Sequence, residues 1–215
     1  MTQLPLPIGW SRHGGAESLL VHDANADALA LIRDWQRWPS PCTLLVGPSR
    51  SGRSLIAEVF LRESGGVLVD DADRADETHL FHLWNEARDS DRPLLMVASE
   101  APPTWTIALP DLRTRLATAA VARILPPDEA VTAALIAHGL ERAGSAFAPD
   151  LPDFLARRTA RCYAAIDSVV AELNALSLAR GQKLSVALAR QALRNNALLD
   201  GADETAPHEG TTDRV

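Results

Sequence analysis

A glycine-flanked segment in the first quarter of the chain carries residue types that bind phosphate. Its spacing is G-x4-G-[K/R]-S, and it reads Gly47, Pro48, Ser49, Arg50, Ser51, Gly52, Arg53 and Ser54. Glycines let backbone amides turn toward phosphate oxygens, and a helix that starts at the end of the segment adds its N-terminal dipole. Ser54 supplies a hydroxyl for Mg²⁺. This spacing therefore predicts a binding site for the phosphates of a nucleotide.

Arg53 departs from the usual form of this motif, which has lysine at that position. A guanidinium keeps the positive charge and can clamp two phosphate oxygens. It is also bulkier than the compact ammonium that follows the transferring phosphoryl group, so the exchange is not conservative. We expect nucleotide binding to survive and hydrolysis to be slow.

Two carboxylates, Asp70 and Asp71, end an apolar run that starts at Val67. A carboxylate at the end of a strand beside a phosphate loop can hold Mg²⁺ directly or through water. We expect Asp70 at the Mg²⁺ site and Asp71 beside the attacking water, where many ATPases use the longer Glu. The alternative is a solvated acidic strand end that leads into Asp73 and Asp76.

The elements that must position these residues follow a simple pattern. Four short apolar runs alternate with segments of helical spacing, which predicts a parallel sheet covered on both faces. The expected strands are 42–46, 67–70, 93–98 and 120–125, and the expected helices are 23–38, 55–63, 77–88 and 112–116. After Pro127 only helical spacing occurs, at 128–142, 150–158, 162–180 and 185–196. The phosphate segment thus lies between a strand and a helix, as its motif requires.

Composition excludes several classes of protein. No apolar stretch is long enough to span a membrane, and we expect no secretion signal because the first residues lack a basic region followed by an apolar core. The two cysteines, Cys42 and Cys162, are expected to be buried and reduced, which fits a cytoplasmic protein. The formal net charge of −7 does not help to neutralise a nucleic-acid backbone, so we expect no direct sequence-specific DNA binding.

With these residues in place, the chain resembles the DnaA-related AAA+ family over about residues 3–196, and in particular its Hda branch, which inactivates the bacterial replication initiator. The resemblance implies a P-loop NTPase of α/β class, with a three-layer parallel sheet of about four to five strands followed by an all-α lid. It implies a clamp-binding segment at 1–12, a nucleotide-binding domain at 13–126, a lid at 127–197 and a disordered tail at 198–215. Its cofactors would be ADP or ATP with Mg²⁺, and a homo-oligomer is possible.

One strand-helix unit of the family is missing. Few residues separate the helix after the phosphate segment from Val67, where the family inserts a further strand and helix. That strand lies at the sheet edge in the family, and an edge strand can be removed without cutting the rest of the ladder. The resemblance therefore implies strand order 5-1-4-3 in the family's numbering.

The first residues of the chain are similar to the peptide with which Hda proteins bind the β sliding clamp of DNA polymerase III. They are Gln3, Leu4, Pro5, Leu6, Pro7 and Ile8. An extended segment with one amide and several apolar side chains can fill a shallow groove, and prolines lower its ordering entropy. The alternative is an apolar tail with no partner.

A second segment, 109–116, resembles the part of the family whose final arginine reaches into a neighbouring subunit's nucleotide site. The motif assigns this role to Arg115, with Arg113 as the nearby alternative. Such an arginine neutralises charge that develops on the γ-phosphate. The alternative role for Arg115 is a surface salt bridge.

Two sensor positions of the family are less well matched. Ser99 or Glu100 stands where a polar sensor follows the third strand, and the residues do not decide between them. The lid arginine of the family aligns with Ala164. Arg161 lies three residues earlier, and is expected on the same helix face, so either Arg161 makes the nucleotide contact or the contact is absent.

The resemblance implies an adaptor that binds the clamp and stimulates ATP hydrolysis by the initiator DnaA through Arg115. Whether the chain is itself an enzyme stays open. One alternative is a small P-loop phosphotransferase in which Arg157, Arg158 and Arg161 bind the acceptor. Another is a DNA-associated loader ATPase.

Overall fold

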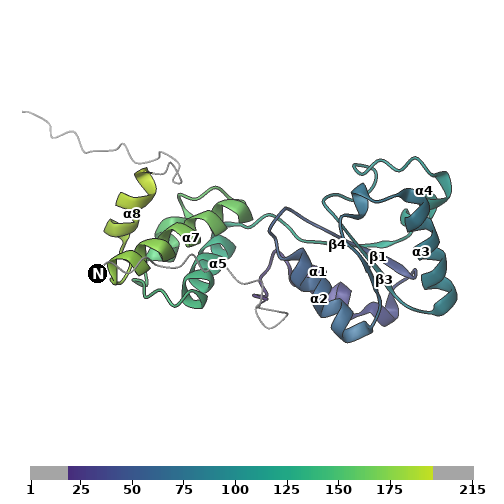
Figure 1. Cartoon of the computed structure of the whole chain (residues 1–215), viewed down its shortest axis with the longest axis horizontal. Helices are drawn as coiled ribbons and strands as arrows, with labels where there is room; N and C mark the ends of the chain where they lie inside the picture. The colour runs from purple at the N-terminus through teal and green to yellow at the C-terminus, as the bar shows by residue number, and fades with distance from the viewer. Residues whose placement is uncertain (1–18, 196–215) are drawn as a thin grey trace, which may run out of the picture. The chain divides into compact units, whose positions relative to one another are not determined.

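The computed structural model describes residues 19–195, which form two compact units (Figure 1). The first unit ends at Val131 and the second begins at Thr132, a division that falls within one helix. The predicted clamp-binding segment at 1–12 lies outside the described residues, as does the predicted tail at 198–215. The predicted domain boundaries stay predictions.

A four-stranded parallel sheet forms the centre of the first unit. The strands are β1 (Cys42–Val46), β2 (Val67–Val69), β3 (Leu94–Ala98) and β4 (Ala120–Arg123). They lie in the order β2-β3-β1-β4. In the family's numbering, β4, β1, β3 and β2 are strands 5, 1, 4 and 3. The observed order is therefore the predicted order 5-1-4-3, and the shortened sheet is confirmed.

Helices cover both faces of the sheet and give the predicted three layers (Figure 1). α1 (Ala26–Arg33) and α2 (Arg53–Ser64) lie on one face, and α3 (Glu77–Ser90) and α4 (Pro110–Leu116) on the other. Every residue of β1 and of β3 is buried, which explains why both strands read as continuous apolar runs.

Alternate residues of the two central strands build one core against α3 and α4. Because side chains of a strand alternate between faces, every second residue of β1 and β3 joins this core. Its strand and helix members include Cys42, Leu44, Val46, Leu94, Met96, Ala98, Leu80, Leu112 and Leu116. The register pairs Val46 with Ala98, so the carboxyl ends of β1 and β3 are fixed side by side.

The connection from α2 to β2 consists of two glycines. Gly65 ends α2 in the left-handed conformation, with φ of 61°. At Gly66 an added Cβ would lie 2.4 Å from the Pro93 carbonyl oxygen and 2.5 Å from the Phe60 ring, so no larger residue fits. This close passage leads α2 directly into β2, with no further strand or helix between them.

The expected helix at 23–38 is shorter in the structure. α1 spans Ala26–Arg33, and a separate 3₁₀ turn, η2, follows at Trp35–Arg37. Trp38 turns back onto the helices: its indole Nε1 donates to the Leu31 carbonyl at 2.8 Å and its ring stacks on Phe60 at 5.5 Å. These contacts end the helix before the prolines that follow.

The second unit contains helices, as predicted. They are α5 (Glu129–Arg142), α6 (Leu151–Ala156), α7 (Tyr163–Arg180) and α8 (Val186–Asn195). A core of aliphatic residues joins them, and includes Ile136, Leu140, Leu155, Ile166, Val169 and Leu184. Among the described residues no helix is both long enough and apolar enough to cross a membrane.

Candidate functional site

The segment 47–54 connects β1 to α2 at the carboxyl edge of the sheet. Arg50 and Gly52 have positive φ, at 63° and 89°, and such turns point successive amides into one concave surface. The first hydrogen bond of α2 joins the Ile56 amide to the Gly52 carbonyl at 3.1 Å. The amides of residues 53–55 therefore have no acceptor within the helix, and they can bind an anion.

Gly47 and Ser51 shape the inner side of this loop. An added Cβ at Gly47 would lie 2.8 Å from the Ile124 Cβ and 3.1 Å from the Ile124 carbonyl oxygen, so the loop passes tightly against the end of β4. Ser51 is buried, and its hydroxyl has no hydrogen-bond partner among the described residues. A buried hydroxyl of this kind is completed by water or by a ligand.

The outer side of the loop faces solvent. Pro48 is half-buried, whereas Ser49, Arg50 and Ser54 are exposed. Ser54 is the second residue of α2. Its hydroxyl is thus accessible at the helix N-terminus, where a phosphate-bound cation would need it.

Arg53 reaches from the start of α2 to the neighbouring strand. Its Nη1 donates to the Ala98 carbonyl, the last of β3, at 2.6 Å. A guanidinium has five donors. The remaining donors of Arg53 have no acceptor within residues 19–195 and are available to phosphate oxygens.

Asp70 and Asp71 lie just beyond β2, and both are exposed. The Asp71 amide donates to Asp70 Oδ1 at 2.9 Å, and Asp71 has φ of 47° where it begins the 3₁₀ turn η3 (Ala72–Arg74). The strand thus ends one residue earlier than expected, at Val69. The predicted roles of the two carboxylates with Mg²⁺ and water stay predictions.

Asp73 was not assigned a role from the sequence, yet it bridges two strand ends. Its Oδ2 accepts from the Ser99 amide at 3.1 Å, immediately after β3. Its Oδ1 is buried, with no partner among the described residues. The only signal in the sequence was a third acidic residue, three positions after Asp70.

Ser99 and Glu100, the two candidates for the polar sensor, differ in their contacts. Ser99 is bonded to Asp73 through its amide, and its side chain is exposed. Glu100 lies 3.8 Å from Arg123 of β4, and both side chains are at least half exposed. An exposed ion pair of this kind adds little stability.

A segment before α1 flanks the phosphate loop, and sequence patterns did not reveal it. A Cβ on Gly52 would lie 3.8 Å from Leu19 Cδ1. The segment is held by Asn25, which accepts from the His22 amide and donates to the Leu20 carbonyl, both at 2.9 Å. Burial lowers the pKa of His22, although the nearby Asp23 and Asp128 oppose this shift. A neutral imidazole therefore lies in this segment at neutral pH.

Arg115 is bound by its own chain. Its guanidinium carbon lies 4.2 Å from the Trp84 ring centroid and 4.5 Å from that of Phe81, and Nη1 donates to Asn85 Oδ1. All three partners belong to α3. Arg113 is exposed, and its side chain makes no hydrogen bond, ion pair or ring contact within the described part of the chain.

Arg161 is exposed and precedes α7, which begins at Tyr163. The expectation that Arg161 and Ala164 share one helix face is wrong, because Cys162 has extended φ and ψ of −143° and 146°. The helical register therefore does not extend back to Arg161. Its predicted contact with nucleotide stays a prediction.

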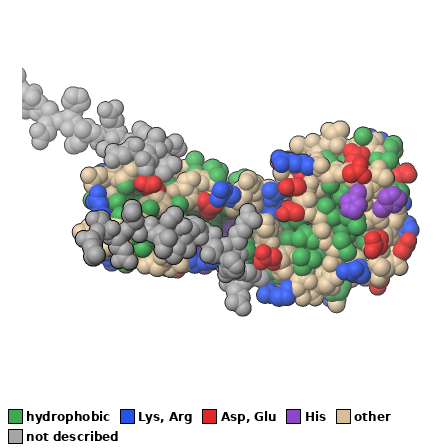
Figure 2. Space-filling view, viewed as in Figure 1, with side chains coloured by type: hydrophobic (Ala, Val, Ile, Leu, Met, Phe, Trp, Pro, Cys, Tyr) green, Lys and Arg blue, Asp and Glu red, His purple; other side chains and the backbone are tan. Residues whose placement is uncertain are grey.

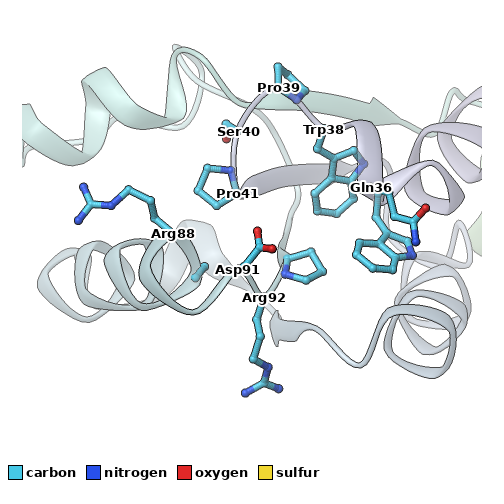
Figure 3. A pocket seen from close by; sticks show the side chains of 11 residues that line it. Gln36, Trp38, Pro39, Ser40, Pro41, Arg88, Asp91 and Arg92 are labelled. Carbon is cyan, nitrogen blue, oxygen red and sulfur yellow. The ribbon is translucent and has the colours of Figure 1, made fainter.

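A separate cavity of about 550 Å³ lies at the amino ends of the strands, on the side of the sheet opposite to the phosphate loop (Figure 3). Pro41 and Pro93 line it and immediately precede β1 and β3, so it is at the amino ends of the strands. Arg88 and Arg92 extend away from its centre. The phosphate loop has no part in this cavity.

Charged side chains of both signs are interspersed on the visible face of the first unit (Figure 2). Lys and Arg side chains do not merge into one basic patch on that face. This view agrees with the acidic net charge of −7.

No protein-family model matches the sequence, but the structure is similar to solved structures of DnaA and of RuvB. Domain III of the Thermotoga maritima replication initiation protein DnaA has a TM-score of 0.69 at 16% identity, over 84% of this chain and 95% of that one. AMPPCP-bound DnaA from Aquifex aeolicus has a TM-score of 0.65 at 12% identity, over 85% and 69%. The Thermotoga maritima RuvB Holliday junction branch migration motor has 0.59 at 12%, over 78% and 65%. The chain therefore has an AAA+ fold like that of these proteins, and its own sheet has four parallel strands that are followed by helices.

Proposed function

We propose that the chain binds ADP or ATP at the loop 47–54, with Mg²⁺ as the accompanying cation. The observation that carries this proposal is the loop itself, where two positive φ angles and a helix start without a side-chain cap leave backbone amides available to an anion. The unpartnered Ser51 hydroxyl and the free donors of Arg53 suit phosphate oxygens. The AMPPCP in the similar DnaA structure supports the assignment.

In this proposal Ser54 and Asp70 serve the cation, and Asp71 lies beside the attacking water. Hard cations such as Mg²⁺ prefer hydroxyl, carboxylate and water oxygens, which these residues supply. The bound cation would offset negative charge on the phosphates. Arg161, in the second unit, is the residue that we propose for a further contact with the nucleotide.

Hydrolysis by the chain itself is proposed to be slow. Arg53 donates one of its hydrogen bonds to the Ala98 carbonyl, and its side chain is bulkier than that of the usual lysine. Asp71 is also shorter than the Glu that many ATPases use. A domain of this kind holds its nucleotide as a structural ligand, which stabilises the fold by mass action.

At the level of the cell we propose an adaptor of the Hda kind. Residues Gln3, Leu4, Leu6, Pro7 and Ile8 would bind the β sliding clamp, and the AAA+ unit would meet ATP held by DnaA. The similarity in fold to domain III of DnaA is what supports this proposal. The reaction would then occur in the nucleotide site of the partner.

The arginine for that site is proposed to be Arg115, with Arg113 as its alternative. Arg115 is half-buried against Trp84 and Phe81, whereas Arg113 is exposed. Arginine fingers gain their effect from a position close to the γ-phosphate. The two residues therefore make opposite predictions for a matched pair of variants.

A reconstituted assay tests the proposal. DnaA loaded with ATP is mixed with clamp on DNA and with this protein, and release of phosphate is followed. We expect stimulation by the wild type, its loss in Gln3→Ala and Leu6→Ala, and its loss in Arg115→Ala with Arg113→Ala as the matched control. Absence of stimulation by the wild type would remove the adaptor mechanism. Stimulation unchanged in all four variants would remove the clamp segment and both arginines from it, and loss in Arg113→Ala alone would move the finger to that residue.

A further inference from the structure

The Ala98–Ser99 peptide group is hydrogen-bonded on both of its polar atoms by charged side chains. Its carbonyl oxygen accepts from Arg53 Nη1 at 2.6 Å, and its N–H donates to Asp73 Oδ2 at 3.1 Å. A peptide group is planar, so its C=O and N–H are fixed relative to each other. The orientation that Asp73 gives to the amide is therefore also the orientation of the carbonyl that Arg53 meets.

We propose that Asp73 is a positioning residue of the nucleotide site, and that it acts on Arg53 through this peptide. The inference rests on the proposed function, because it names what aims the guanidinium at the phosphates. It assigns to Asp73 a task that differs from the cation and water roles proposed for Asp70 and Asp71.

Electrostatics favours this three-part arrangement. A carboxylate that accepts from the N–H polarises the peptide group, which makes the carbonyl a better acceptor for a guanidinium. Both bonds are charge-assisted, and such bonds are stronger than bonds between neutral groups. Among residues 19–195, the Asp73 carboxylate accepts a hydrogen bond from the Ser99 amide alone. This bond therefore links the carboxylate to that peptide group and to no other protein donor in the described chain.

The fold makes the arrangement possible. β3 lies between β2 and β1 in the sheet, Asp73 follows β2, and Arg53 follows the loop after β1. The end of β3 is thus the only one of the sheet's strand ends that is adjacent to both. Arg53 has a long side chain, and it spans from the start of α2 to that strand end while its other donors stay available.

The consequence is a phosphate site that is set before nucleotide arrives. With Asp73 in place, the guanidinium is held at β3 beside the loop. Without it, the peptide group at 98–99 can rotate, and Arg53 loses a fixed acceptor. Binding of a diphosphate would then have to order the arginine, which costs side-chain entropy.

A double-mutant cycle tests the proposal, with Asp73→Ala, Arg53→Met, the double variant and the conservative Asp73→Asn. We expect Asp73→Ala to weaken ADP binding about tenfold in the wild-type background and to add almost nothing in the Arg53→Met background. Asp73→Asn keeps an acceptor for the Ser99 amide and should restore most of the affinity. An exposed acid on α4, Asp111→Ala, is the matched control for loss of one negative charge.

The second arm of the test measures thermal unfolding of the same variants without nucleotide. Each single variant should lower the midpoint by about 3 °C, and the double variant should lower it no further than the larger single effect. Equal loss of ADP affinity in both backgrounds, or additive midpoints, would overturn the inference. If the wild type itself binds no ADP, the proposed function fails, and the nucleotide-free arm still decides whether Asp73 and Arg53 are coupled.

Discussion

The guanidinium of Arg115 packs against the indole of Trp84, at 4.2 Å from the ring centroid, while Phe81 lies on the same group at 4.5 Å. Attraction between a cation and an aromatic ring increases as the pair is desolvated, and Arg115 is half-buried. The residue that resemblance assigns to a partner's active site is thus also part of the packing of α3 against α4.

Arg115→Ala should therefore destabilise the protein even where no partner is present. We expect the free energy of unfolding to fall by about 2 kcal/mol, since two ring contacts and the Asn85 hydrogen bond are lost. Arg113→Ala, at an exposed position of the same helix, should change it by less than about 0.5 kcal/mol. Urea unfolding of the two variants measures both values, and equal stability of the two would contradict the packing role.

Gly47→Ala should be more damaging than a glycine change at an open position. The new Cβ would lie 2.8 Å from the Ile124 side chain, and relief of this overlap must shift the phosphate loop or β4, at a cost of about 2 kcal/mol. Gly65→Ala is the control: φ is 61° but no atom lies within 4 Å, so only backbone strain of about 1 kcal/mol applies. The order of the two urea midpoints is the readout. A reversed order would mean that Gly47 is not tightly packed.

Alkaline pH should destabilise the second unit through Tyr163. Burial raises the pKa of Tyr163 to about 12 from an ordinary value of 10.0. Between these values the unfolded chain has lost the phenolic proton and the folded chain keeps it, so stability is full below the ordinary value and falls as pH rises toward 12.

The chain has one tyrosine, so phenolate absorbance reports Tyr163 alone. At about pH 10, the folded protein should show almost no phenolate, and urea-unfolded protein should show about half. Tyr163→Phe is the blank. Half-ionisation of the folded protein at that pH would refute the burial of the phenol.

The two cysteines should differ in reactivity. Cys42 is buried in β1, and burial raises the pKa of its thiol, so little nucleophilic thiolate forms. Cys162 is exposed at the start of α7, so the expectation that both thiols are buried is wrong for this residue. Native protein should take up one equivalent of an alkylating reagent, at Cys162, and urea-unfolded protein two. Rapid double labelling of native protein would contradict the placement of β1 at the centre of the sheet.

The sequence was sufficient to predict the central strands of the sheet because β1 and β3 are buried on both faces. β1 was predicted at its observed bounds, since Pro41 and Gly47 flank an uninterrupted apolar run. The helix at 23–38 was too long, because hydrophobic spacing continues through Trp35 and Trp38 although Trp38 folds back onto Phe60. Local patterns do not record such a tertiary contact.

The candidate site also has a part that the sequence predicted and a part that it did not. The loop at 47–54 was predictable because its motif is contiguous in the chain. The contacts of Asp73 with Ser99, of Arg53 with Ala98 and of Leu19 with the loop join residues far apart in sequence, and no spacing rule relates them. Arg161 was expected on a helix face because it lies three residues before Ala164. That spacing does not reveal that Cys162, between Arg161 and α7, is extended.

Isothermal titration of the purified chain with ADP in the presence of Mg²⁺ tests the central claim most directly. The account predicts saturable binding to one site per chain, and a marked loss of affinity in Gly52→Val, where φ of 89° opposes a β-branched side chain. Absence of heat from the wild type at millimolar ADP, together with an unchanged thermal midpoint, would contradict it.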